Sequence, residues 1–85
     1  MDINKNLKAV IKDVSIRDID IKDITNETVL TSDLGFDSVQ IISLIVELES
    51  NFDIEIEDDD LDIEKLTVYK SLLDLISKKL SAKGL

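Results

Sequence analysis

Hydrophobic residues near the N-terminus recur at helical spacing. Successive members are separated by four, three, one and three residues, which places them on one face of a helix. They are Ile3, Leu7, Val10, Ile11 and Val14. The pattern predicts an amphipathic helix across these positions, with Lys5, Lys8, Lys12 and Asp13 facing water.

The stretch from Ser15 to Phe36 keeps no sustained helical period. Its turn-favouring residues are Asn26, Ser32, Asp33 and Gly35. We therefore predict a long loop, and loops beyond about 12–15 residues are uncommon and often functional. The hydrophobic residues expected to fasten it to the core are Ile16, Ile19, Ile24, Val29, Leu30 and Leu34.

A second helix is predicted from Ser38 to about Asn51. Asp37 is a suitable N-cap, and Gln40 three residues later completes a pair that resembles a capping box. Gly35, just ahead of this start, permits a tight approach of the chain.

The second helix carries more apolar residues than one buried face needs. Four of them point inward together: Ile41, Leu44, Ile45 and Leu48. A second stripe with the spacing i, i+3 and i+7 comprises Val39, Ile42 and Val46. This stripe either belongs to the core or forms an exposed apolar strip that another protein covers.

Beyond the second helix, residues 52–57 alternate between apolar and polar as a strand does. An isolated strand is unstable, so an extended loop is expected, followed by a short helical turn around Asp59 to Glu64. The last helix is expected to start after Thr67 as its N-cap. Its apolar stripe is Val68, Leu72, Leu75, Ile76 and Leu80.

These elements predict an all-α fold in a single domain of residues 1–85. The fold is a four-helix bundle with three longer helices, one short third helix, and a long loop between the first and second helices. At 85 residues such a domain depends on efficient apolar packing, and Ile, Leu and Val together supply 31 residues.

The composition excludes most catalytic chemistry. Histidine and cysteine are both absent, so the chain has no imidazole base, no thiolate nucleophile and no ordinary zinc or haem site. We find no nucleophile elbow and no glycine-rich phosphate loop, and we predict that the protein is not an enzyme. The N-terminal residues lack the order of a signal peptide and no apolar run reaches the length of a membrane span, which predicts a cytoplasmic protein.

Acidic residues were also compared with a calcium-binding loop. The positions that match its first, third, fifth and twelfth residues are Asp53, Glu55, Glu57 and Glu64. Asp58 stands where the loop requires glycine, and apolar Ile54 and Ile56 interrupt the frame, so an EF-hand is not predicted. Loose binding of divalent cations by the acidic residues stays open.

Negative charge is concentrated in one half of the chain. The formal net charge is −9, and residues 23–64 hold fourteen acidic residues and no lysine or arginine. Such a field repels nucleic acid and anionic membranes and favours basic proteins as partners.

Ser38 lies at the start of the second predicted helix. A serine beside an aspartate at this place is most often part of a cap. An exposed hydroxyl at the positive end of a helix dipole is also a favourable carrier of a phosphate ester, although the neighbouring Asp37 opposes the added charge in part.

Taken together, these features resemble those of the acyl carrier proteins and related phosphopantetheine carrier domains. The resemblance begins at Leu34-Gly35-Phe36-Asp37-Ser38-Val39. It continues through Leu44, Leu48-Glu49, Phe52, Ile54, Ile56, Leu66-Thr67-Val68, Leu72 and Ile76.

The resemblance implies that Ser38 receives 4′-phosphopantetheine from coenzyme A through a phosphopantetheinyl transferase, and that the thiol of this arm holds acyl groups as thioesters. It further implies a monomer that delivers its cargo to acyl-transfer, condensing and ligase enzymes with basic docking patches. The positions implied to touch these partners are Asp37, Val39, Ile42, Val46 and Glu49.

Fatty-acid carriers usually have Ala-Asp-Ser-Leu at the attachment site, followed by acidic residues where this chain has Gln40 and Ser43. A role in fatty acid or polyketide biosynthesis is expected, with a discrete peptidyl or aminoacyl carrier of a specialised pathway as the alternative. An alternative from a different class of function is an acidic adaptor protein or a divalent-ion sensor without a prosthetic group. Phosphorylation of Ser38 is a third possibility.

Overall fold

The structure, a computed structural model, describes residues 2–57 and 66–82. Three longer helices dominate it: α1 (Ile3–Val14), α3 (Ser38–Phe52) and α5 (Tyr69–Ala82). Within the two described stretches no β-strand occurs, and the all-α prediction is confirmed. The predicted short helical turn from Asp59 to Glu64 lies outside the described residues.

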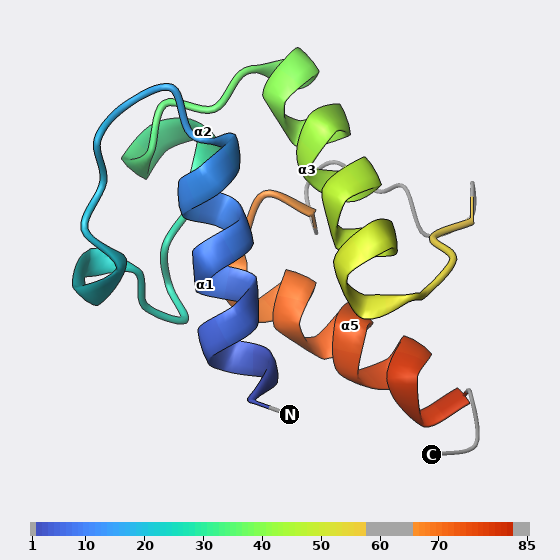
Figure 1. Cartoon of the computed structure of the whole chain (residues 1–85). Helices are drawn as coiled ribbons and strands as arrows, with labels where there is room; N and C mark the ends of the chain where they lie inside the picture. The colour runs from blue at the N-terminus through green and yellow to red at the C-terminus, as the bar shows by residue number, and fades with distance from the viewer. Residues whose placement is uncertain (1, 58–65, 83–85) are drawn as a thin grey trace.

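The three longer helices pack around one core. Figure 1 shows α1 beside α3, with the two running in roughly opposite directions, and α5 crossing near the C-terminal end of α3. The long loop wraps around the other side of α1 before the chain returns to begin α3. As a result, α3 starts at the same end of the molecule at which α1 finishes, and Ser38 lies at that end.

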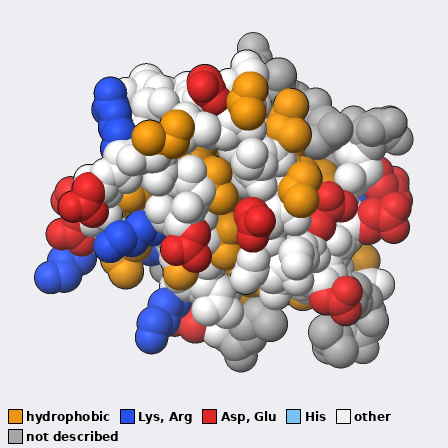
Figure 2. Space-filling model, turned by 45° about the horizontal axis from the view of Figure 1, so that its top comes forward, with side chains coloured by type: hydrophobic (Ala, Val, Ile, Leu, Met, Phe, Trp, Pro, Cys, Tyr) orange, Lys and Arg blue, Asp and Glu red, His pale blue; other side chains and the backbone are white. Residues whose placement is uncertain are grey.

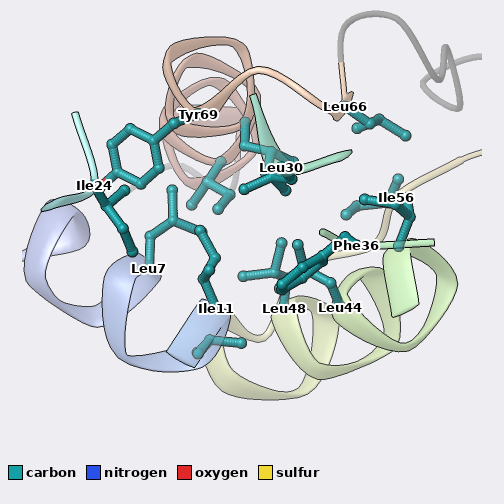
Figure 3. Close-up of a cluster of buried hydrophobic side chains, with 14 of the residues drawn as sticks. Leu7, Ile11, Ile24, Leu30, Phe36, Leu44, Leu48, Ile56, Leu66 and Tyr69 are labelled. Carbon is teal, nitrogen blue, oxygen red and sulfur yellow. The ribbon is translucent and has the colours of Figure 1, made fainter. Parts of the chain in front are cut away.

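Residues from every longer helix and from the loops fill the core. In Figure 3 the ring of Phe36 lies against Leu44 and Leu48, while Tyr69 lies beside Leu7 and Ile24. The buried hydrophobic residues are Leu7, Val10, Ile11, Ile24, Leu30, Leu34, Phe36, Ile41, Leu44, Leu48, Phe52, Ile54, Ile56, Leu66, Tyr69, Leu72 and Ile76.

The long loop contains two short helices that the sequence pattern did not indicate. They are η1 (Ile21–Asp23) and α2 (Leu30–Asp33), each too short to establish a hydrophobic period. Ile24, Leu30 and Leu34 fasten the loop to the core as predicted. The prediction for Ile16 was wrong, because its side chain is 86% exposed.

The start of α5 is set by pairing with this loop. The Thr67 carbonyl accepts a hydrogen bond from the Leu30 N–H at 2.6 Å, and the Tyr69 N–H donates to the Thr28 carbonyl at 2.9 Å. Val68 and Val29 form an isolated antiparallel bridge between them. These bonds hold Val68 in the bridge, so α5 begins only at Tyr69. The residue directly before the helix is therefore Val68 and not the Thr67 that the sequence predicts.

Tyr69, the first residue of α5, is buried and links this helix to α1. It is not among the residues of the apolar stripe predicted for the last helix. Its hydroxyl lies 3.1 Å from the Asn4 carbonyl oxygen and also contacts the side-chain oxygen of Asn4. The Lys8 ammonium lies 5.9 Å from the ring centroid, so Lys8 is partly covered instead of simply facing water. Burial, with a smaller contribution from Asp2, raises the pKa of Tyr69 to about 12.

Candidate attachment and docking site

Ser38 is positioned by the residues on both sides of it. The Asp37 carboxylate accepts a hydrogen bond from the Gln40 N–H at 2.8 Å, and the Gln40 side chain accepts one from the Asp37 N–H at 3.1 Å. These reciprocal bonds form the predicted capping box, which is confirmed. Ser38 is therefore the first helical residue, and its hydroxyl is not needed for the cap.

The linker before Ser38 is anchored to the core. Gly35 has a φ of 74°, a left-handed conformation that favours glycine. This turn lets the Phe36 N–H donate to the Leu30 carbonyl at 3.0 Å, and the Phe36 side chain is only 3% exposed. Because Phe36 is fixed, the start of α3 two residues later is fixed as well.

The Ser38 side chain is exposed to solvent. Within residues 2–57 and 66–82, its hydroxyl has no hydrogen-bond partner, and the backbone N–H groups of Ser38 and Val39 have none either. Unpaired N–H groups at a helix start give a local positive potential that stabilises an anion. The site therefore suits an esterified phosphate group.

The second apolar stripe of α3 lies at the surface. Val39, Ile42 and Val46 are 70%, 63% and 56% exposed, whereas the neighbouring Ile41 and Leu44 are buried. The structure thus decides between the two alternatives in favour of an exposed apolar strip. Figure 2 shows hydrophobic side chains on this surface with acidic side chains near them.

Glu49, predicted as a docking residue, also has a role inside the protein. Its Oε2 accepts a hydrogen bond from the Ile56 N–H at 3.0 Å, and its carbonyl accepts one from the Ile54 N–H at 3.2 Å. Asp53 between them ends α3 with a φ of 52°. These contacts hold residues 54–57 in a non-helical segment, with Ile54 and Ile56 buried. The loop was predicted over residues 52–57, but Phe52 is still part of α3.

Three acidic residues of the calcium-loop comparison, Asp53, Glu55 and Glu57, lie in the described part of the chain. Glu55 and Glu57 project outward from the non-helical segment, as does Asp53. Over the described stretches, no group of three or more acidic side chains is arranged to hold a metal ion. Asp58 and Glu64 lie outside the described residues.

Arg17 lies against the linker that precedes Ser38, and no pattern in the sequence indicates this contact. A Cβ atom at Gly35 would lie 3.0 Å from Arg17 Cζ and 3.2 Å from both Nε and Nη1. The guanidinium therefore rests against the backbone of Gly35. Residues 17 and 35 belong to a segment without a period, so no pattern related them.

The sequence was compared with known proteins. A family model described as a phosphopantetheine attachment site matches residues 6–77. An acyl carrier protein of Desulforapulum autotrophicum is 35% identical over 79 residues, covering 93% of this chain and 99% of that protein. An acyl carrier protein of Buchnera aphidicola is 39% identical over 77 residues, covering 88% and 94%. One of Thermotoga maritima is 36% identical over 62 residues, covering 73% and 74%.

The geometry at the start of α3 fits the group that this family model describes. An exposed serine hydroxyl is available for esterification, and two unpaired N–H groups beside it favour the negative charge of a phosphodiester. No helix in the described part of the chain is long and apolar enough to cross a membrane. The chain belongs to the acyl carrier protein family, whose members bear 4′-phosphopantetheine as a covalent prosthetic group.

Proposed function

We propose that this protein carries acyl groups on a 4′-phosphopantetheine arm attached to Ser38. The observation that carries the proposal is the exposed hydroxyl of Ser38 at the first position of α3, beside a capping box that does not use it. The arm supplies a terminal thiol, the reactive group that a chain without cysteine lacks.

Loading requires a phosphopantetheinyl transferase and coenzyme A. A bond forms between Ser38 Oγ and the phosphorus of the pantetheine phosphate, while the bond from that phosphorus to the bridging oxygen breaks. The adenosine bisphosphate portion of coenzyme A leaves, and the hydroxyl proton passes to a base of the transferase. This chain contributes the acceptor hydroxyl and has no histidine to serve as that base.

The docking surface we propose consists of Asp37, Val39, Ile42, Val46 and Glu49. The exposure of the three apolar residues supports it, because a partner enzyme that covers them removes apolar surface from water. Acidic residues around the strip favour basic partners and make encounter sensitive to salt. Tethering then raises the effective concentration of the cargo at each partner enzyme.

We propose that the protein is itself a carrier and not a catalyst, acting as a monomer in the cytoplasm with one carrier domain over residues 1–85. The names of its relatives support an acyl cargo. We propose fatty acid or polyketide biosynthesis as the pathway. Gln40 and Ser43 reduce the negative charge early in α3, which keeps a peptidyl or aminoacyl carrier as the alternative.

Intact-mass measurement after incubation with coenzyme A and a broad-specificity transferase tests the attachment. Wild type and Ser43→Ala, a matched control at another exposed serine of α3, should each gain one phosphopantetheine. Ser38→Ala should gain none and keep its circular dichroism spectrum, because Asp37 still caps α3. A loaded Ser38→Ala variant would refute the assignment, and an unmodified wild type would favour an adaptor or ion sensor.

A further inference from the structure

The fold brings one positive charge into the negative stretch of the chain. Residues 23–64 contain no lysine or arginine, and Gly35 and Ser38 both lie within them. Arg17 comes from outside this stretch, yet its guanidinium rests against Gly35, three residues before Ser38. A side chain at position 35 would occupy this space, so the glycine permits the close approach.

The guanidinium of Arg17 is not bonded to another group of the described protein. In the part of the chain that the structure describes, its guanidinium forms no hydrogen bond and no ion pair. Several carboxylates line the same surface hollow as Arg17, those of Asp18, Asp20, Asp23 and Asp33 among them. None of these carboxylates forms an ion pair with Arg17 in the described residues, so the five N–H donors of its exposed guanidinium are open to a further anion.

The anion that the proposed function places here is a phosphodiester on Ser38. The unpaired N–H groups of Ser38 and Val39 approach it from the helix start, but the Asp37 carboxylate beside them repels it. A guanidinium offers a planar pair of donors that matches two phosphate oxygens, and its charge offsets that of Asp37. Gly35 and Ser38 are at most about 11 Å apart along an extended chain, so the guanidinium has to turn from Gly35 toward Ser38 to contact this phosphate.

We propose that Arg17 is a positioning residue that binds the phosphate joining the arm to Ser38. The proposal rests on the proposed attachment at Ser38. Since the contact forms only after loading, Arg17 stabilises the loaded protein more than the unloaded protein and restricts the base of the arm.

The test compares wild type with Arg17→Gln, Arg17→Lys and Lys22→Gln. Lys22→Gln is the matched control: it removes one charge from the same loop, and Lys22 borders a different hollow with Asn4 and Lys5. Intact mass first establishes that each variant is loaded. Melting temperatures of the loaded and unloaded forms are then measured at low salt.

Loading should raise the melting temperature of wild type and Lys22→Gln by about 2–5 °C more than that of Arg17→Gln, as expected for one exposed ionic contact in a small domain. Arg17→Lys should recover part of this difference. In wild type, the NMR signal of the Arg17 Nε–H should shift on loading. A merely structural role for Arg17 would change both forms equally and leave the difference unaltered.

One contrary result is that all variants load and that loading raises the melting temperature of Arg17→Gln as much as that of wild type. This result would overturn the role of Arg17 and leave the attachment at Ser38 intact. Slower loading of Arg17→Gln without any difference between the loaded proteins would also overturn it, since Arg17 would then act on the transferase or coenzyme A. Failure of wild type to load would overturn both proposals.

Discussion

The carboxylate of Glu49 accepts a hydrogen bond from the backbone N–H of Ile56, seven residues later, at 3.0 Å. Glu49 lies near the end of α3, and Ile56 is buried in the non-helical segment that follows. One side chain therefore holds this segment against the core and also contributes charge beside the proposed docking strip. A test of docking at Glu49 has to separate these two roles.

Glu49→Gln keeps an oxygen that accepts the Ile56 N–H bond but removes the charge, whereas Glu49→Ala removes both. Urea unfolding should show a free energy of unfolding near that of wild type for Glu49→Gln and about 1 kcal/mol lower for Glu49→Ala. Both variants should slow turnover by a basic partner enzyme at low salt, with the defect shrinking at high salt. If Glu49→Gln supports wild-type turnover at both salt concentrations, the charge has no role in docking.

Ile41 and Ile42 are adjacent in α3 but face opposite environments, being 5% and 63% exposed. Ile41→Ala should lower the free energy of unfolding by about 2–5 kcal/mol, because it leaves a cavity in the core. Ile42→Ala should change it by less than about 0.5 kcal/mol and yet raise the KM of a partner enzyme for the loaded carrier. An unchanged KM would show that the strip is not a docking surface.

The capping box predicts a difference between two replacements of Asp37. Asp37→Asn keeps an acceptor for the Gln40 N–H, so its melting temperature should stay close to that of wild type. Asp37→Ala leaves that N–H without its partner and should cost about 0.5–2 kcal/mol in the free energy of unfolding. Equal stabilities of the two variants would mean that the cap contributes little to α3.

Gly35→Ala places a side chain at a φ of 74°, which should cost about 1–2 kcal/mol. The new Cβ would also press on the Arg17 guanidinium, but that flexible side chain can move aside. The loss should therefore be the same in the wild-type and Arg17→Gln backgrounds, as measured by urea unfolding of the four proteins. A much smaller loss in the Arg17→Gln background would show that contact with Arg17, and not backbone strain, causes the cost.

Burial gives Tyr69 a pH-dependent effect on stability. Its pKa in the folded protein is about 12, above the ordinary value of 10.0, so folding favours the neutral phenol. This contribution is complete below pH 10 and is lost as the pH rises from about 10 to about 12. Unfolding of wild type and Tyr69→Phe across this range should show a steeper decline for wild type, since lysine titration is common to both. Parallel curves would contradict the raised pKa.

Local patterns in the sequence predict the three longer helices and the start of α3. The first and second helices follow from periodic apolar residues, and the pairing of Asp37 with Gln40 depends on residues only three positions apart. Local reasoning placed Ser38 at the start of this helix, and the resemblance to acyl carrier proteins identified it as a candidate for attachment. Local reasoning did not detect η1 and α2, because helices of three and four residues contain too few positions to show a period.

Contacts between distant segments could not be predicted in this way. The apolar stripe predicted for the last helix does not include Tyr69, although this residue is 1% exposed and its hydroxyl reaches Asn4, far away in the sequence. The apolar side chain of Ile16 predicts a place in the core, but the path of the loop leaves it exposed. Both errors concern the path of a segment through the fold, and the composition of the segment does not determine this path.

Local features of the sequence are sufficient to specify the three longer helices, the start of α3 and the lack of a thiol in the chain. These properties depend on backbone hydrogen bonds and apolar spacing within a few residues, or on composition alone. The exposure of Val39, Ile42 and Val46 and the contact of Arg17 with Gly35 depend instead on how distant segments pack together. Both outcomes arise because the core can cover one face of α3 and because the loop folds back to the linker before Ser38.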